Sequence, residues 1–181
     1  MKALILLANG FEQTEALTTQ DILFRSKQIQ PELASISSTH EVVSSMGLQV
    51  HVPLLLSIAD LDAYDMLILP GGKVGVENLL NNEKVAETIA YFKANNRPVY
   101  AICAAPSILG KQGYLKGKRY TVYPGFETEE GECEEKGVVT DDDLITGRAM
   151  AFTIDFACEI VRRHCGDACV KELLHGARGH I

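Results

Sequence analysis

A cysteine stands where a predicted strand turns into a predicted helix. Residues 98–102 form a short apolar run, and Cys103 follows it directly. Ala101 and Ala105, two positions before and after it, are small, as a tight strand-to-helix turn requires. A thiol at the start of a helix faces the positive end of the helix dipole, which favours the thiolate, and the N–H of Ala104 could serve an oxyanion. We therefore predict that Cys103 is a nucleophile; the alternative is an inert buried cysteine.

A proline and two glycines follow another apolar run. Leu69 ends this run, and Pro70, Gly71 and Gly72 come next. In open α/β sheets, ligands bind outside the carboxyl ends of the strands. Two glycines there allow the backbone to approach a ligand closely, and their N–H groups can hold an anion. The alternative is a plain tight turn, which the same residues would also mark.

Two glutamates follow the first apolar run of the chain. Glu12 and Glu15 are three residues apart, so on a helix they would share one face. A carboxylate at the start of a helix ordinarily does no more than offset the helix dipole. If Glu15 points into an apolar site instead, burial raises its pKa and makes it a proton donor or acceptor. We predict this second role for Glu15.

Strand-like and helix-like patterns alternate along the chain, which predicts an α/β fold with a mainly parallel sheet. The expected strands are residues 3–7, 33–37, 64–69 and 98–102, with a strand pair at 137–140 and 144–147. The expected helices are residues 11–26, 83–94, 104–109, 151–164 and 167–174. Residues 41–56 should be a hairpin or an excursion from the sheet, and 123–136 an acidic loop.

The apolar faces of two helices can be named from their spacing. The first helix should bury Ala16, Leu17, Ile22 and Phe24, and the helix over 151–164 should bury Ile154, Ala157, Cys158 and Val161. Asn82 is the expected N-cap of the helix over 83–94, and Pro106 fits the first turn of the helix after Cys103. No repeat or linker divides the chain, so residues 1–181 are expected to form a single domain.

Composition excludes several classes of protein. With 46% hydrophobic and 23% charged residues the chain is too apolar for disorder. A net charge of −7 disfavours nucleic acid and anionic membrane as partners, and no apolar run reaches membrane-spanning length. Five cysteines and no export signal predict free thiols in the cytoplasm. His164, Cys165, Cys169 and His175 lack the paired spacing of a zinc site, so neither a metal nor another cofactor is expected.

Four segments together resemble the ThiJ/PfpI superfamily, and specifically its deglycase (DJ-one) branch. They are LILLANGFEQTEA, LILPGG, AICAAP and GRAMAFTIDFACEIV, and the resemblance covers nearly the whole chain. It implies a flavodoxin-like three-layer sandwich, usually a homodimer. It also implies that Cys103 is the nucleophile, that Glu15 is a protonated acid bonded to its sulfur, and that Gly72 and Ala104 contribute N–H groups. Arg25 and Arg148 match positions near the pocket and dimer interface.

The chain departs from the family pattern at two positions next to the nucleophile. Protease-like members carry a histidine directly after the cysteine, where this chain has Ala104. Some deglycase members carry a histidine at the position of Tyr123, whose hydroxyl could bind substrate instead. The turn before the last long helix also differs, at residues 148–151. A cysteine–histidine hydrolase is therefore disfavoured.

Three functions remain open for this site. The first is a cofactor-free enzyme in which Cys103 attacks a small dicarbonyl such as methylglyoxal, or its protein adducts, as a glyoxalase or deglycase in carbonyl or oxidative stress. The second is a redox sensor or stress chaperone in which Cys103 is oxidised to a sulfinic acid. The third is a PfpI-like peptidase or other hydrolase, which would need a histidine from elsewhere.

Overall fold

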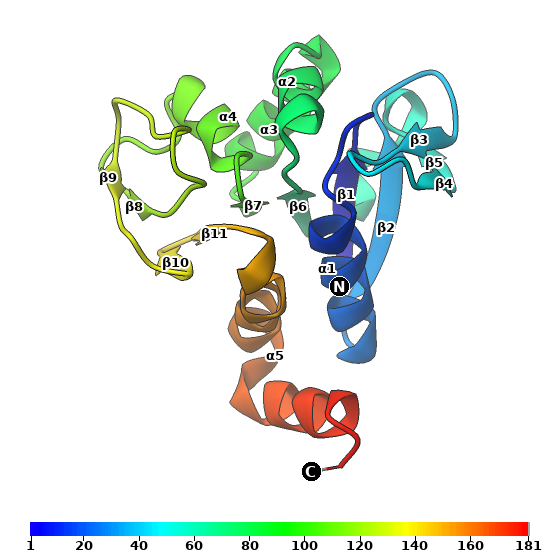
Figure 1. Ribbon diagram of the computed structural model, residues 1–181, viewed down its shortest axis with the longest axis vertical. Coiled ribbons are helices and arrows are strands. Elements are labelled where there is room, and N and C mark those ends of the chain that lie inside the picture. The colour runs from blue at the N-terminus through cyan, green and yellow to red at the C-terminus, as the bar shows by residue number, and fades with distance from the viewer. Residues whose placement is uncertain (181) are drawn as a thin grey trace.

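A seven-stranded sheet runs through the middle of the molecule, with helices on both of its faces (Figure 1). The computed structural model describes residues 1–180. The strand order is β10-β11-β7-β6-β1-β2-β5, and every neighbouring pair is parallel except β10 and β11. The strands are β1 (Lys2–Leu7), β2 (Gln30–Ser35), β5 (Leu54–Leu55), β6 (Met66–Leu69), β7 (Val99–Ile102), β10 (Val138–Asp141) and β11 (Leu144–Gly147). The predicted α/β fold with a mainly parallel sheet is confirmed.

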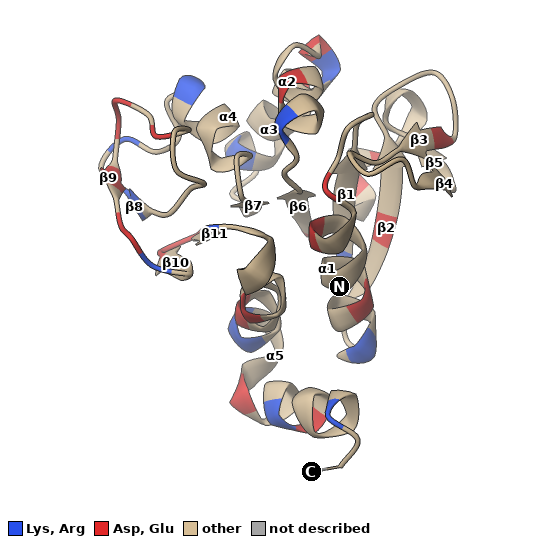
Figure 2. Ribbon diagram, viewed as in Figure 1, with Lys and Arg blue, Asp and Glu red and all other residues tan. Residues whose placement is uncertain are grey.

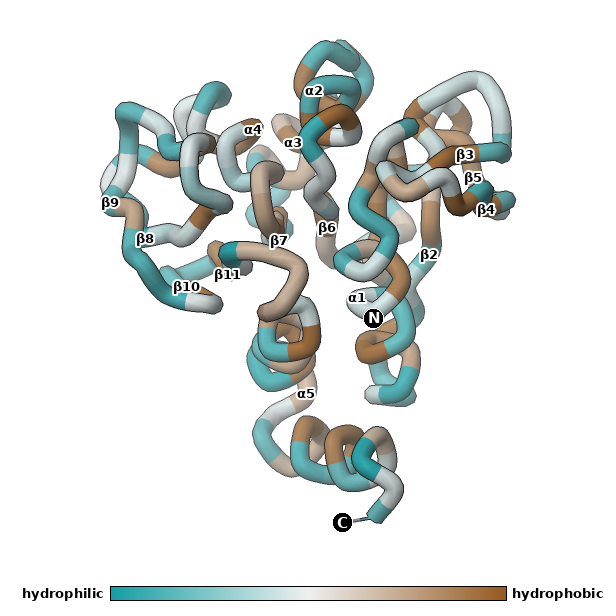
Figure 3. The backbone as a smooth tube through the Cα atoms, in the orientation of Figure 1, coloured by the Kyte–Doolittle hydropathy of each residue, from teal (hydrophilic) through white to brown (hydrophobic). Residues whose placement is uncertain are grey.

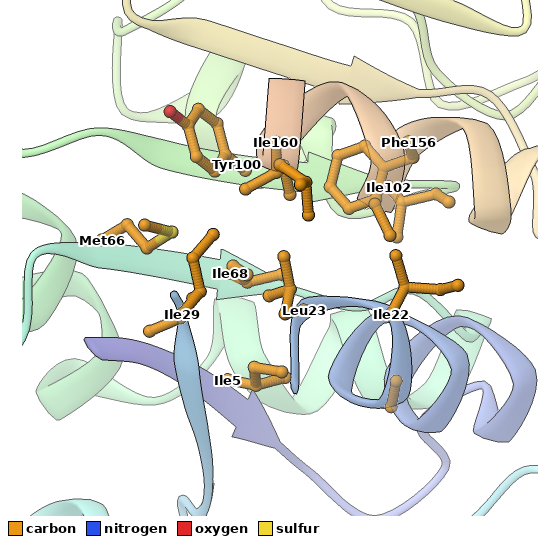
Figure 4. Close-up of a cluster of buried hydrophobic side chains, with 14 of the residues drawn as sticks. Ile5, Ile22, Leu23, Ile29, Met66, Ile68, Tyr100, Ile102, Phe156 and Ile160 are labelled. Atoms are coloured by element: carbon orange, nitrogen blue, oxygen red, sulfur yellow. The ribbon is translucent and has the colours of Figure 1, made fainter. Parts of the chain in front are cut away.

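Each face of the sheet is covered by its own helices. The helices α1 (Gln13–Arg25) and α5 (Thr153–Ala177) pack on one face, and α2 (Lys73–Leu80), α3 (Glu83–Ala94) and α4 (Pro106–Lys111) on the other. Successive side chains of a strand point to opposite faces, so Ile5 joins the first core and Leu4 the second. Figure 4 shows the first core, in which α1 and α5 meet the strands. Each fully buried Leu or Ile stabilises the fold by about 1.5–3 kcal/mol.

Shorter elements decorate the sheet. β3 (Glu41–Val43) and β4 (Gln49–His51) form an antiparallel hairpin, and β5 then returns to the sheet edge, so residues 41–56 are both a hairpin and an excursion. β8 (Arg119–Tyr120) precedes the acidic segment and pairs with β9 (Glu132–Cys133), which lies within that segment; the rest of the segment is loop (Figure 2). Three short 3-10 helices are η1 (Leu56–Ile58), η2 (Leu61–Ala63) and η3 (Met150–Phe152).

Several details differ from the sequence-based expectations. The helix α2 was not predicted, because it has only eight residues and includes Gly75, which lowers helix propensity. Phe24 and Ile154 were assigned to buried faces but are 66% and 51% exposed. Leu23 is buried in place of Phe24, because the buried stripe of α1 runs through Ala16, Thr19 and Leu23. Asn82 does cap α3, accepting from the N–H of Val85.

Hydropathy is distributed as the layers require (Figure 3). Hydrophobic residues recur along the strands and on the inner sides of the helices, and hydrophilic residues collect in the segment that carries β9. None of the helices within residues 1–180 combines the length and apolar character needed to cross a membrane.

Candidate active site

Three loops meet at the carboxyl ends of neighbouring parallel strands. β6 lies between β1 and β7, and the segments after these strands carry Glu15, Gly71 and Cys103 respectively. The chain runs outward from β1 to β2 on one side and to β6 on the other, so the strand order reverses beside β1. Ligands of open α/β sheets bind at such a reversal. The fold therefore brings the predicted residues together at the edge where a site is expected.

Cys103 sits on a strained turn between β7 and α4. Its φ is 63°, in the left-handed region that a residue with a Cβ seldom adopts. The turn is fixed from both sides, because the N–H of Cys103 donates to the Gly147 carbonyl at 2.9 Å and its own carbonyl accepts from Tyr123 N–H at 2.8 Å. Ala104 and Ala105 are buried, so the turn has no room for larger side chains. The thiol itself is partly exposed. This is the nucleophile-elbow geometry that the sequence predicted.

Glu12 and Glu15 have separate roles. Glu12 lies before α1 as its N-cap, and its carboxylate accepts from the N–H of Glu15 at 2.7 Å. Glu15 is only 1% exposed, and its Oε2 accepts from the N–H of Gly71 at 2.8 Å. The other oxygen, Oε1, is buried and has no hydrogen-bond partner among residues 1–180. Glu12 therefore caps α1, as a glutamate at the start of a helix ordinarily does, and the Glu15 side chain lies in the candidate site.

Burial sets the protonation of Glu15. Desolvation raises the pKa of its carboxyl from 4.5 to about 7, with a smaller contribution from the charge of Glu12, while bonds to Cys103 and Gly71 oppose the rise. A carboxyl with this pKa is partly protonated near neutral pH, so it can both donate and accept a proton. This is the acid–base character that the sequence analysis proposed for Glu15.

The Cys103 thiol is more difficult to ionise than the sequence suggested. Burial, then the charge and hydrogen bond of Glu15, raise its pKa to about 12, while the N–H groups of Gly72 and Ala104 lower it. The expected helix dipole is weak, because α4 has six residues and begins only at Pro106. When Glu15 is protonated its charge is gone and its O–H can donate to the sulfur. The two side chains therefore titrate as a pair.

The glycine pair after β6 is required by close packing. A Cβ on Gly71 would lie 2.5 Å from both the Cβ of Cys103 and Oε2 of Glu15. A Cβ on Gly72 would lie 2.4 Å from the carbonyl oxygen of Gly10, and Gly72 has a φ of 94°. The pair is thus more than a plain turn: its lack of side chains allows the acid, the thiol and the β1–α1 loop to approach one another.

Gly75 also positions the site, and the sequence did not predict this role. Gly75 lies in α2, and its N–H donates to the Gly10 carbonyl at 3.1 Å. A Cβ there would lie 2.8 Å from Cα and N of Phe11, so only glycine lets α2 pack this closely on the β1–α1 loop. A glycine three residues after Gly72, inside a short apolar segment, was the only signal available.

The other residues that the sequence singled out, Tyr123, Arg25 and Arg148, lie outside the pair formed by Cys103 and Glu15. Tyr123 is tied to Cys103 through the main chain, and its 46% exposed ring packs edge-on against Phe126. Arg25 ends α1, three turns after Glu15, where it pairs with Asp21 at 2.6 Å. Burial and then the charge of Glu127 raise the pKa of the Cys133 thiol, and the nearby charge of Arg148 partly offsets that rise. Arg25 therefore does not contribute to the pocket of its own chain.

The histidines are engaged elsewhere. His164 hydrogen-bonds the Tyr100 hydroxyl at 2.9 Å, His40 stacks on His51, and His175 packs against His180. No hydrogen bond joins any of them to Cys103 in the part of the chain that the structure describes. This geometry disfavours a cysteine–histidine hydrolase. Residues 1–180 also contain no group of three or more His, Cys, Asp or Glu side chains placed to hold a metal ion.

The chain is similar to known proteins over most of its length. The DJ-1/PfpI family model matches residues 1–163. Protein DJ-1 homolog B of Arabidopsis thaliana is 33% identical over 167 residues, which are 90% of this chain but only 38% of the plant protein. Protein DJ-1alpha of Drosophila melanogaster is 33% identical over 176 residues, 94% of this chain and 81% of the fly protein.

A solved structure is similar throughout. The DJ-1 superfamily protein of Salmonella typhimurium, crystallised as a cysteine-to-alanine mutant, superposes with a TM-score of 0.92 at 34% identity, covering 98% of this chain and 97% of that one. Its fold is the flavodoxin-like sandwich described above. Together with the family match along most of the chain, these similarities show that the protein belongs to the DJ-1/PfpI family.

Proposed function

We propose that this protein is a cofactor-free enzyme that acts on small dicarbonyls such as methylglyoxal, or on their protein adducts, during carbonyl or oxidative stress. The observation that carries the proposal is the contact between Cys103 and Glu15, a carboxyl with a pKa raised to about 7 by burial. An aldehyde needs a nucleophile for its carbon and an acid–base group for its protons, and the pair supplies both. Cys103 is partly exposed, so a small substrate could reach its sulfur.

The chemistry can be written with these two side chains and water. The Cys103 sulfur attacks the aldehyde carbon while Glu15 gives its proton to the oxygen, which forms a hemithioacetal. The Glu15 carboxylate then removes the proton from that carbon and returns it to the adjacent carbon, while the hydroxyl proton of the hemithioacetal moves to the ketone oxygen. The former ketone thereby becomes a hydroxyl and the former aldehyde carbon becomes the carbonyl of a thioester with Cys103. Water hydrolyses the thioester to lactate and restores the thiol. The net reaction adds one water to methylglyoxal, with no oxidant or reductant.

The N–H groups around Cys103 have a defined place in this sequence. Those of Gly72 and Ala104 interact with the sulfur, and they would stabilise the thiolate before attack and after each release. The Gly71 N–H holds Oε2 of Glu15, which leaves Oε1 free for the proton transfers. Each of these donors is on the main chain, so none can be removed by a side-chain substitution.

The test is methylglyoxal consumption with lactate detection, on protein freed of contaminating glyoxalases. We expect Cys103→Ser to reduce turnover to background and Glu15→Gln to reduce kcat by about 100-fold or more, the usual contribution of an acid–base group. Cys133→Ser is the matched control, since Cys133 lies in the acidic segment, and it should retain full activity. An active Cys103→Ser variant would contradict the proposal.

A second candidate function is a redox sensor or stress chaperone that uses the same thiol. The observation that favours it is the unpartnered Oε1 of Glu15, which when protonated could donate to a sulfinate on Cys103. After mild peroxide treatment, peptide mapping should then find two oxygens on Cys103 before any other cysteine. Equal oxidation of all five cysteines would argue against this function.

A further inference from the structure

Two further cysteines line a groove at the other end of α1. The groove has a volume of about 930 Å³ and lies between the end of α1 and the second half of α5. Cys165 and Cys169 both line it, beside Phe24 and Leu173, and both thiols are partly exposed. Neither residue belongs to the site around Cys103. The groove gives small molecules in solution access to both sulfurs.

A break in α5 separates the two cysteines. Gly166 has φ 84° and ψ 167°, so Cys165 ends the first half of α5 and Cys169 lies in the first turn of the second half. In an unbroken helix, residues four apart have Cβ atoms about 5–6 Å apart. A disulfide needs about 3.5–4.5 Å, so a continuous helix would hold the sulfurs too far apart. The break removes that restraint, and Gly166 has open space around it for the backbone to turn.

The two thiols lie close enough to influence each other. Burial, then the charge and hydrogen bond of Cys169, raise the pKa of Cys165. The Cys169 thiol also donates to the carbonyl oxygen of Ser26, at 3.6 Å, at the C-cap of α1. Cys133 lies on β9, and Cys158 lies about two turns before Cys165 in the first half of α5.

We propose that Cys165 and Cys169 form a redox-active dithiol, which a hydroperoxide converts into an intramolecular disulfide. One sulfur, as its thiolate, attacks the peroxide oxygen and becomes a sulfenic acid, with release of an alcohol, or of water from hydrogen peroxide. The second sulfur attacks the first and displaces its hydroxyl as water, forming the S–S bond. Two thiols and one peroxide thus give one disulfide, and the peroxide takes up two electrons. A thiol reductant reverses the reaction.

This site is independent of the function proposed for Cys103. It lies at the end of α1 remote from Glu15, and it needs no substrate of that site. Disulfide formation would also remove the thiol that donates to Ser26, so oxidation alters a contact between α5 and the C-cap of α1. The experiment can therefore be done in a Cys103→Ser background, where failure of the dicarbonyl reaction has no influence on the outcome.

The test is a peptide map after treatment with hydrogen peroxide and then iodoacetamide. Arg163 and Lys171 flank both cysteines, so trypsin releases them in one peptide, residues 164–171, while Cys133 and Cys158 fall in other peptides. We expect this peptide to lose two hydrogens, to resist alkylation, and to recover two alkylation sites after reduction. Cys133 and Cys158 should remain alkylated under the same conditions and serve as internal controls.

Single-cysteine variants sharpen the result. Cys165→Ser and Cys169→Ser should each abolish the loss of two hydrogens, and the remaining cysteine should be trapped as a sulfenic acid by dimedone. Cys158→Ser should leave the disulfide unchanged. If a variant fails to fold, the map of the parent chain still decides. A doubly alkylated peptide 164–171, oxygen added to one sulfur alone, or a disulfide between two chains would overturn the proposal.

Discussion

At the scale of single residues, the candidate site depends on one buried pair. Cys103 and Glu15 are 88 positions apart in sequence and each shifts the pKa of the other. The sequence named both residues as candidates and predicted the tight turn at Cys103, but it overestimated the helix dipole and contained no information on burial. In the folded protein the N–H groups of Gly72 and Ala104, and not a helix dipole, favour the thiolate form of Cys103. Desolvation of the thiol opposes their effect.

Gly71 offers a test of how tightly this pair is held. A Cβ in Gly71→Ala would lie 2.5 Å from both Cys103 Cβ and Glu15 Oε2, so one of them must move. A displacement of about 1 Å at a reacting group can lower the rate about 100-fold, and we expect a loss of that size in methylglyoxal turnover. The measurement is kcat/KM on protein whose urea midpoint shows that it is folded.

Gly176→Ala is the control for that substitution. Gly176 lies in α5 with open space around it, so the same change should leave turnover unaltered. Full activity in Gly71→Ala would show that the site has more room than these distances indicate.

At the scale of elements, the sequence predicted whether a segment is a helix or a strand better than it predicted where that element begins and ends, and it missed one helix. Apolar runs gave the strands β1, β6 and β7, and the N-cap Asn82 gave the start of α3. The helix α2 was not predicted because it is short and contains Gly75, which lowers helix propensity. Phe24 and Ile154 were misassigned because helical spacing alone does not fix the rotation of a helix about its axis.

The break in α5 leads to a prediction at this scale. Gly166, with φ 84° and ψ 167°, occupies a region that is essentially restricted to glycine. We expect Gly166→Ala to reduce the free energy of unfolding by about 1–3 kcal/mol, because the alanine would be strained. Urea denaturation monitored by circular dichroism measures the change.

The sign of that change is informative. In a continuous helix, replacing glycine by alanine stabilises by about 0.5–1 kcal/mol. Gly176→Ala, whose position is helical, should show that stabilisation. A similar gain for Gly166→Ala would mean that α5 is unbroken.

At the scale of the whole molecule, the buried carboxyl of Glu15 links stability to pH. Its pKa is 4.5 when unfolded and about 7 when folded, so the folded state holds the proton more tightly. The resulting stabilisation is complete below about pH 4.5 and is lost as the pH rises through about 7. Its full size is about 3 kcal/mol.

Comparison with Glu15→Gln isolates this contribution. We expect the free energy of unfolding of the wild type, minus that of the variant, to fall by about 3 kcal/mol between pH 4.5 and 8. Urea denaturation at intervals of pH gives this difference. A constant or rising difference would show that Glu15 is not the group that burial holds protonated.

The homodimer that the family resemblance implies stays a prediction, which sedimentation equilibrium tests directly.

The sequence by itself predicted most of the elements in their order and the residues that meet in the candidate site. Alternating apolar runs and helical patterns required a parallel sheet, and parallel strands place their carboxyl ends at one edge. Glu15, Gly71 and Cys103 each follow such a strand, so their proximity could be predicted from topology. Turn chemistry predicted the elbow at Cys103, because only small residues fit around it.

The tertiary structure decided what depends on contacts between distant segments. The pKa of Glu15 is set by burial and by Gly71, 56 residues away, and no local pattern encodes that environment. The same holds for Cys165 and Cys169. On a continuous helix their Cβ atoms would be about 5–6 Å apart, and the non-helical backbone at Gly166 releases that spacing. Desolvation and the interaction of two thiols depend on packed neighbours, so they arise only when the chain is folded.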